Sequence, residues 1–156
     1  MGEISMKTKK LSKILVPVDG SKESICACRW AGTVAEATGA TIYLVHVVDL
    51  NLKMTSFDRV SMSGYIPENI KKQGEELLLD YRRHMPGQLA VNLMLETGSP
   101  HQTIVNITEQ LEPDWIIMGS RGASNLKEIV MGSVSQYVLH HVQCPVMIVK
   151  DNDKNV

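Results

Sequence analysis

Short apolar runs of strand length alternate with segments of helical periodicity along almost the whole chain of 156 residues. The run 41–48 (TIYLVHVV) is apolar at nearly every position, which is typical of a strand that is covered on both faces. Residues 13–18, with the sequence KILVPV, form another such run before Asp19 and Gly20. The remaining strands are predicted over residues 89–95, 115–118 and 145–149.

Segments with helical spacing of apolar residues separate these strands. They lie over residues 21–38, 67–84, 100–111 and 133–142. Gly39 is expected to end the first, and Ser99 followed by Pro100 is expected to cap and open the third. Repeated strand–helix–strand units with apolar strands predict a parallel sheet with helices on both faces. The fold class is therefore a three-layer α/β sandwich, with the non-periodic stretch 51–66 as a long connection.

Composition excludes several functional classes. Sixteen basic and seventeen acidic residues give a net charge of −1, which is not the basic footprint of a nucleic-acid-binding protein. Neither a membrane-spanning apolar run nor a signal-peptide core is present, so we expect a single cytoplasmic domain over residues 1–156. Three cysteines without the Cys-x-x-Cys spacing are expected to be buried, reduced thiols; they are Cys26, Cys28 and Cys144.

The richest candidate for a binding site follows the fourth predicted strand. Gly119 comes directly after this strand, Gly122 lies three residues later, and Gly132 with Ser133 precedes a predicted helix. Without a β-carbon, Gly119 and Gly122 are expected to take positive φ values and to let a ligand approach the backbone. The free N–H groups at the start of the helix favour an anion. Two such clusters of amides predict a phosphate-binding cleft, to which Arg121 would add charge.

Taken singly, each of these glycines is also explained by a strand-exit turn or a helix start. The stretch is neither a P-loop, because Gly-Lys-Ser/Thr is absent, nor a Gly-x-Gly-x-x-Gly dinucleotide fingerprint. Residues 116–150 (IIMGSRGASNLKEIVMGSVSQYVLHHVQCPVMIVK), however, resemble the C-terminal signature of the universal stress protein family. Residues 14–21 (ILVPVDGS) and 44–49 (LVHVVD) are similar to the first two strands of that family. The resemblance covers about residues 10–150 and includes the Gly-x2-Gly-x9-Gly-Ser pattern of the ATP-binding branch.

This resemblance implies a Rossmann-like sheet of order 3-2-1-4-5 and an adenine nucleotide as ligand. Pro17 and Val47 match positions that hold adenine, and Asp19 matches an acidic position near ribose and phosphate. The remaining positions match those that clamp ribose and triphosphate; they are Gly119, Ser120, Arg121, Gly122, Ala123, Ser124, Asn125, Gly132, Ser133, Val134 and Ser135. Mg²⁺ or Mn²⁺ would be held through the phosphates, because few carboxylates converge here. The family also implies a homodimer that pairs the last strand, residues 146–149.

Several polar residues keep two interpretations from the sequence alone. Asp19 fits a general base or a metal-supporting carboxylate, and it equally fits a turn cap in Asp-Gly-Ser. His46 is interpreted as a core histidine with a hydrogen-bonding partner, and His140 with His141 as a favourable charge at a helix end. His101, in the first turn of a helix, has no evident partner in the sequence.

Three functional hypotheses follow. The first, which we favour, is a dimeric ATP-binding stress-response regulator whose nucleotide state alters a surface for an unidentified protein partner. The second is a slow ATPase or nucleotidyl-transfer enzyme that uses Asp19 and Arg121, with weak hydrolysis at most because other candidate groups are lacking. The third is a structural dimer with an empty pocket, which would make the three-glycine spacing accidental. We expect no nucleic-acid or membrane partner.

Overall fold

The computed structural model describes residues 8–50, 66–122 and 131–151. In chain order its elements are β1 (Lys13–Pro17), α1 (Lys22–Thr38), β2 (Thr41–Val48), α4 (Glu68–Arg83), β3 (Val91–Thr97), α5 (Pro100–Leu111), β4 (Trp115–Gly119), α6 (Ser133–His141) and β5 (Val146–Val149). These elements confirm the alternation of strands and helices that the sequence predicts. Residues 51–65, which make up nearly all of the predicted connection 51–66, lie outside the described residues.

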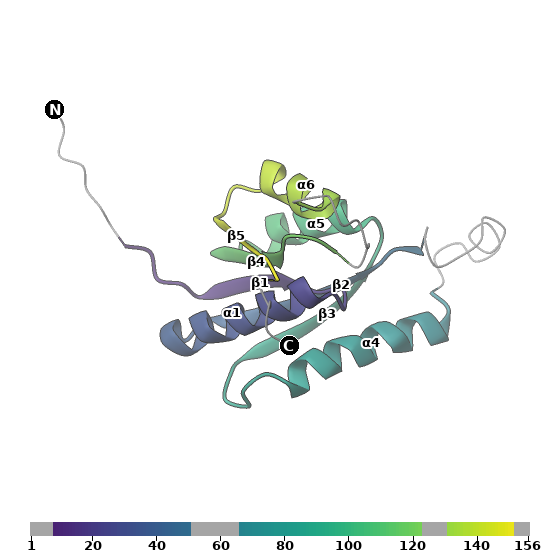
Figure 1. Cartoon of the computed structure of the whole chain (residues 1–156), viewed down its shortest axis with the longest axis horizontal. Coiled ribbons are helices and arrows are strands. Elements are labelled where there is room, and N and C mark those ends of the chain that lie inside the picture. Colours follow the sequence, from purple (N-terminus) through teal and green to yellow (C-terminus); the bar gives the residue numbers. More distant parts are fainter. Residues whose placement is uncertain (1–7, 51–65, 123–130, 152–156) are drawn as a thin grey trace.

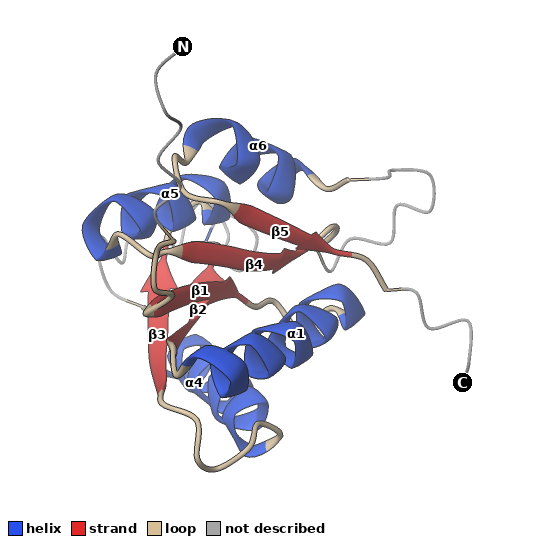
Figure 2. Cartoon of the chain, turned by 90° about the vertical axis from the view of Figure 1, so that its left-hand side faces the viewer, coloured by secondary structure: helices blue, strands red, loops and turns tan. Residues whose placement is uncertain are grey.

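The five strands form one parallel sheet in the order β3-β2-β1-β4-β5, which confirms the order implied by the family resemblance. Helices α1 and α4 cover one face, and α5 and α6 cover the other (Figures 1 and 2). Alternate residues of β1 divide between two cores: Ile14 and Val16 belong to the cluster under α1 and α4, whereas Leu15 belongs to the cluster under α5 and α6. All three side chains are fully buried, so both faces of the sheet are covered.

The strand order places a switch point beside β1. From β1 the chain proceeds outward through β2 to β3, and then returns to the other side of β1 to form β4 and β5. The connections that leave the carboxyl ends of β1 and β4 therefore diverge to opposite faces of the sheet, which leaves a crevice between them. The position of any ligand site is thus set by the topology before its side chains are considered.

Local signals explain most element boundaries. Ser21 caps α1 by accepting a hydrogen bond from the Ser24 amide, and Gly39 ends this helix with a φ of 72°. Ser99 occupies the N-cap position of α5, but its side chain makes no capping hydrogen bond, contrary to the prediction. The predicted strand 89–95 is shifted to Val91–Thr97, because the Leu89 amide bonds the Pro86 carbonyl in a turn.

The three cysteines are free, which confirms that they are not paired. Only Cys28 is buried, and burial raises the pKa of its thiol to about 12, so this thiol is neutral at physiological pH. Cys26 and Cys144 are partly exposed, which corrects the prediction that all three are buried. Within the described ranges, no helix has the length and apolar character that would let it cross a membrane.

Asp114 joins the amino ends of β1 and β4. Its Oδ2 accepts hydrogen bonds from the amides of Ser12 (2.8 Å) and Lys13 (3.0 Å), and its Oδ1 lies 2.7 Å from Lys9 Nζ. The Lys9 side chain and, after it, these two amides lower the pKa of Asp114 from its ordinary value of 3.8 to about 2. The ionised carboxylate therefore stabilises the folded state.

We expect Asp114 to make part of the stability of the protein pH-dependent. Because its pKa is lower in the folded than in the unfolded chain, its contribution is complete above pH 4 and is lost as the pH falls from about 4 to about 2. Asp114→Ala should lower the free energy of unfolding at pH 7 by about 1 kcal/mol, through the lost amide partners, and should remove this acid-dependent step. Urea unfolding at several pH values measures both effects. Lys9→Ala should reduce this acid-dependent step without removing it, because Lys9 is the largest cause of the lowered pKa of Asp114 and the two amides remain.

Candidate functional site

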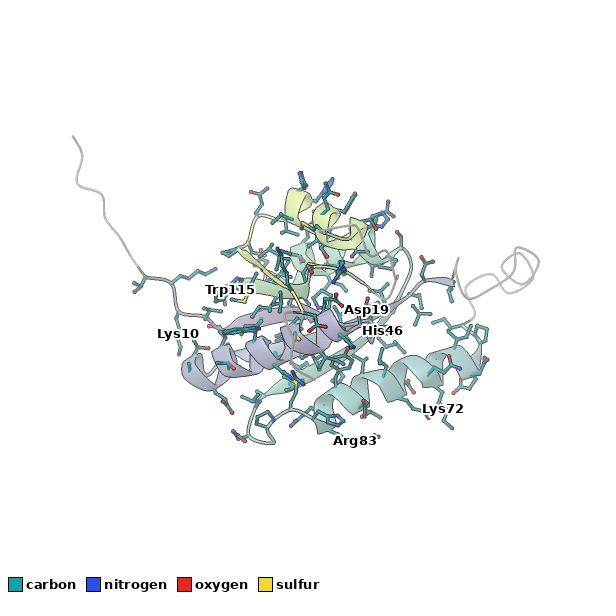
Figure 3. The ribbon with its side chains drawn as sticks, in the orientation of Figure 1. Lys10, Asp19, His46, Lys72, Arg83 and Trp115 are labelled. Atoms are coloured by element: carbon teal, nitrogen blue, oxygen red, sulfur yellow. The ribbon has the colours of Figure 1, made fainter. Side chains whose placement is uncertain are left out.

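A cavity of about 560 Å³ occupies the crevice at the carboxyl ends of β1, β2 and β4. Figure 3 shows Asp19 and His46, which both line it, close together, whereas Trp115 at the start of β4 lies toward the other end of the sheet. Of the residues predicted for the site, the cavity is lined by Pro17, Asp19, Val47, Gly119, Arg121, Gly122, Gly132, Ser133, Val134 and Ser135. Ala123, Ser124 and Asn125 lie outside the described residues.

The bend after β4 and the start of α6 meet in space. The Gly132 amide donates a 2.6 Å hydrogen bond to the Ser120 carbonyl. A β-carbon placed on Gly132 would lie 3.3 Å from Arg121 Cα and 3.6 Å from the Gly122 nitrogen. The backbone of the two segments is therefore in contact, and the amino-terminal end of α6 opens onto the same cavity as Gly122. This juxtaposition supplies the two clusters of amides that suit an anion.

The glycines of this bend are needed for a different reason from the predicted one. Neither Gly119 nor Gly122 has a positive φ; among the glycines that the structure describes, those that do are Gly20, Gly39 and Gly98. A β-carbon on Gly119 would instead lie 2.8 Å from Glu23 Cβ and 2.9 Å from its carbonyl carbon. A β-carbon on Gly122 would lie 2.8 Å from Asp19 Oδ2. Close packing, of Gly119 against the first turn of α1 and of Gly122 against Asp19 in the turn before it, explains both positions better than a left-handed backbone.

Two serines of the predicted site have structural hydrogen bonds. Ser120 is buried and does not line the cavity, and its amide donates to the Val149 carbonyl at 2.7 Å. Ser135 is also buried, and its hydroxyl donates to the Gly119 carbonyl at 2.8 Å. These bonds join β4, β5 and α6 beneath the cavity. Ser133, by contrast, is exposed at the first position of α6, where its amide and hydroxyl are accessible to a ligand.

Arg121 forms an ion pair with Glu23. Its Nη2 lies 2.9 Å from Glu23 Oε1, and the Glu23 side chain is only 12% exposed, against 37% for that of Arg121. Glu23 lies in the first turn of α1, where a negative charge is favourable. The Arg121 guanidinium, which the sequence places beside the predicted phosphate cleft, is therefore paired with the Glu23 carboxylate.

Asp19 shapes the turn between β1 and α1. Its Oδ1 accepts hydrogen bonds from the Ser21 amide (3.0 Å) and the Ser21 hydroxyl (2.6 Å). The turn-capping interpretation of Asp19 is therefore confirmed. Its other oxygen, Oδ2, faces Gly122, so this carboxylate also borders the cavity.

The histidines have partners that the sequence indicates only in part. His46 Nδ1 lies 2.8 Å from the Val18 carbonyl, which confirms a hydrogen-bonded histidine, although its ring is half-buried and lines the cavity. The rings of His140 and His141 bond the carbonyls of Gln136 and Tyr137, one helical turn earlier.

His101, for which the sequence showed no partner, lies 3.0 Å from the Ser99 hydroxyl through Nδ1 and packs edge-on against Tyr137. One partner, Ser99, lies two residues before His101 in the sequence. The other, Tyr137, belongs to α6 and is distant in sequence. Over residues 8–50, 66–122 and 131–151, no three His, Cys, Asp or Glu side chains form a group that could hold a metal ion.

Helix α4 contributes a wall of the cavity that the sequence analysis missed. Ile70, Gln73, Gly74 and Leu77 all line it. The sequence does contain a signal of this wall, because Gly74 is an isolated glycine within a helical segment. Such a glycine often marks a position where another element packs closely against the helix. A β-carbon on Gly74 would lie 2.5 Å from Leu95 Cδ1, so this glycine lets α4 lie close to the sheet beside the cavity.

A parallel sheet with helices on both faces and a cavity at its switch point defines the class of open, doubly wound α/β domains. The model of the universal stress protein family matches residues 10–150. The chain therefore belongs to the universal stress protein family.

Individual relatives agree with this assignment. Universal stress protein MJ0531 of Methanocaldococcus jannaschii is 33% identical over 145 residues, which cover 91% of this chain and 84% of that protein. The solved structure of MJ0577 from the same organism is 32% identical, with a TM-score of 0.65 and coverage of 95% of this chain and 100% of that one. An Arabidopsis thaliana universal stress protein family protein with AMP bound has the same fold at 20% identity, with a TM-score of 0.63 and coverage of 93% and 96%.

Proposed function

We propose that this protein is an adenine-nucleotide-binding regulator of the stress response, with ATP as its ligand. The observation that carries the proposal is the contact between the bend after β4 and the amino end of α6 at the edge of one cavity. A volume of about 560 Å³ is within the range of small-molecule sites. The AMP bound to the Arabidopsis relative is consistent with a ligand of this class.

Within this proposal the amides of Gly122 and Ser133 hold phosphate oxygens, with Arg121 at the edge. Pro17 and Val47, at the ends of β1 and β2, hold the adenine ring, and Val47 offers backbone groups to its edge. Ala123, Ser124 and Asn125 complete the clamp. Mg²⁺ or Mn²⁺ would be bound mainly by the phosphates, because Asp19 and Asp49 are the acidic residues among those lining the described cavity.

Calorimetric titration of the purified protein with ATP and with AMP tests the proposal directly. We expect saturable binding with one site per chain, and ATP should bind more tightly than AMP if the amides hold the additional phosphates. Mass spectrometry of the native protein would show whether nucleotide co-purifies. A folded protein that binds neither ATP nor AMP would contradict the proposal and leave a structural role.

Slow hydrolysis is a second candidate function, because Asp19 and Arg121 both border the cavity. Asp19 Oδ1 is already bonded by Ser21, and Arg121 is paired with Glu23, so neither group is positioned for fast phosphoryl transfer. Phosphate release by the pure protein measures this activity. Release that disappears in Asp19→Asn would favour the enzyme over the regulator.

We also propose a homodimer that forms through β5, with the nucleotide state altering a surface for another protein. β5 lies at the end of the sheet and pairs only with β4 on its inner side, so the outer edge of this described sheet offers main-chain groups to a second copy. Sedimentation should give twice the chain mass of 17.3 kDa. A monomer at all concentrations would contradict this part.

The Glu23–Arg121 pair is expected to oppose nucleotide binding. A phosphate must compete with Glu23 for the guanidinium, and the carboxylate repels the ligand at close range. Glu23→Gln should therefore tighten ATP binding by roughly 3- to 10-fold. Calorimetry measures this change, and Glu36→Gln on the same helix is the matched control, since Glu36 does not line the nucleotide cavity. Weaker binding of ATP by Glu23→Gln would show that the ion pair positions Arg121 instead.

A further inference from the structure

Tyr81 connects helix α4 to the turn that borders the nucleotide cavity. It lies near the carboxyl end of α4 and its side chain is only 7% exposed. Its hydroxyl is 2.6 Å from the hydroxyl of Ser24 in the first turn of α1, and the Ser24 hydroxyl in turn bonds the Ser21 carbonyl. A residue more than 50 positions away in sequence is thus linked to Ser21 through Ser24.

The direction of each hydrogen bond follows from the number of protons available. A carbonyl only accepts, so Ser24 gives its single hydroxyl proton to the Ser21 carbonyl, 2.9 Å away. Tyr81 must therefore donate to Ser24 Oγ. In this chain of hydrogen bonds, which runs from Tyr81 through Ser24 to Ser21, the Ser24 hydroxyl both donates and accepts.

Burial keeps the donor protonated. It raises the pKa of the Tyr81 hydroxyl to about 12, so the proton is retained across the physiological range. The same turn is held from the other side by His46, which donates from Nδ1 to the Val18 carbonyl, and internally by Asp19. Gly20 itself has a φ of 86°, a left-handed conformation that glycine adopts without strain and that turns the chain from β1 into α1.

We propose that Tyr81 is a positioning residue of the nucleotide site, whose hydroxyl holds the turn 19–21 so that Asp19 stays next to Gly122 at the edge of the cavity. This inference rests on the proposed function, since it assumes that the cavity binds nucleotide. Asp19 Oδ2 lies 2.8 Å from the position that a β-carbon of Gly122 would take, so a small shift of the turn changes the space beside the Gly122 amide. Tyr81 does not line the nucleotide cavity and acts on it through Ser24, which does.

The test is ATP titration of Tyr81→Phe, which removes the hydroxyl and keeps the ring. We expect the Kd to rise roughly 3- to 10-fold, because one buried hydrogen-bonding link to the turn is lost. Amide hydrogen exchange at Gly20 should accelerate in the same variant, since the turn that contains it loses the link through Ser24. Both measurements are made well below the melting temperature of each protein, so that a loss of global stability does not enter.

Tyr43→Phe is the matched control, because Tyr43 lies on β2 and packs against the core under α5 and α6. It should leave both the Kd and the exchange of Gly20 unchanged. Faster exchange at Gly20 with an unchanged Kd in Tyr81→Phe would show that Tyr81 is merely structural and would overturn the inference. A wild-type protein that binds no ATP would overturn the proposed function and this inference together. This outcome is distinguishable from an unchanged Kd in Tyr81→Phe, which would overturn only the inference.

Discussion

Gly122→Val is expected to abolish measurable ATP binding while the protein stays folded. The new side chain would start 2.8 Å from Asp19 Oδ2 and would occupy the space next to the Gly122 amide. Obstruction of this amide by the valine side chain and displacement of the carboxylate should weaken binding roughly 100-fold or more, which is about 2.7 kcal/mol. The fold should tolerate the change, because the new side chain would contact Asp19 Oδ2, which is the end of a flexible side chain at the edge of a cavity.

The outcome is measured by calorimetry, with circular dichroism as the check of folding. Gly87→Val is the matched control: nothing lies within 4 Å of a β-carbon there, and Gly87 does not line the nucleotide cavity. Gly132→Val should also lose ATP, because its β-carbon would press on Arg121 Cα at 3.3 Å. If both cavity variants keep the affinity of the wild type, the two bends do not hold the phosphates and the proposed site is misplaced.

The sequence predicts the scaffold well because its signals are local. Apolar strands such as 41–48, the glycine after α1 and the proline in the first turn of α5 each act on their own neighbourhood, and the structure places these elements as predicted. The sheet order depends on long-range pairing, and only the family resemblance supplied it. The glycine spacing itself predicted that the bend after β4 and the start of α6 form one cleft, and the structure shows the two segments in contact.

What the sequence could not predict is the set of contacts between distant elements at the site. Glu23 and Tyr81 follow ordinary helical patterns, and no periodicity indicates that one pairs with Arg121 and the other with Ser24. The φ values of Gly119 and Gly122 were mispredicted for the same reason. A glycine that is needed because another helix lies against it has the same appearance in a sequence as one needed for a left-handed backbone.

Gly119→Ala is expected to have the largest effect on stability among the variants considered, because Gly119 is the point where β4 meets α1. Its β-carbon would lie 2.8 Å from Glu23 Cβ, 2.9 Å from the Glu23 carbonyl carbon and 3.1 Å from the Ser24 nitrogen. Two of these atoms are backbone, so relief requires α1 to move away from the sheet. Overpacking of this kind should lower the free energy of unfolding by about 1–3 kcal/mol.

Urea unfolding of Gly119→Ala measures this loss, and Gly87→Ala is the control that should change stability by less than about 0.5 kcal/mol. The same shift of α1 would carry Glu23, Ser24 and the turn 19–21 with it, so ATP affinity should fall together with stability. A variant as stable as the wild type would mean that α1 moves freely at its first turn. The turn 19–21 would then have no fixed position relative to β4. The close packing of α1 on Gly119 would not be what positions this turn at the nucleotide cavity.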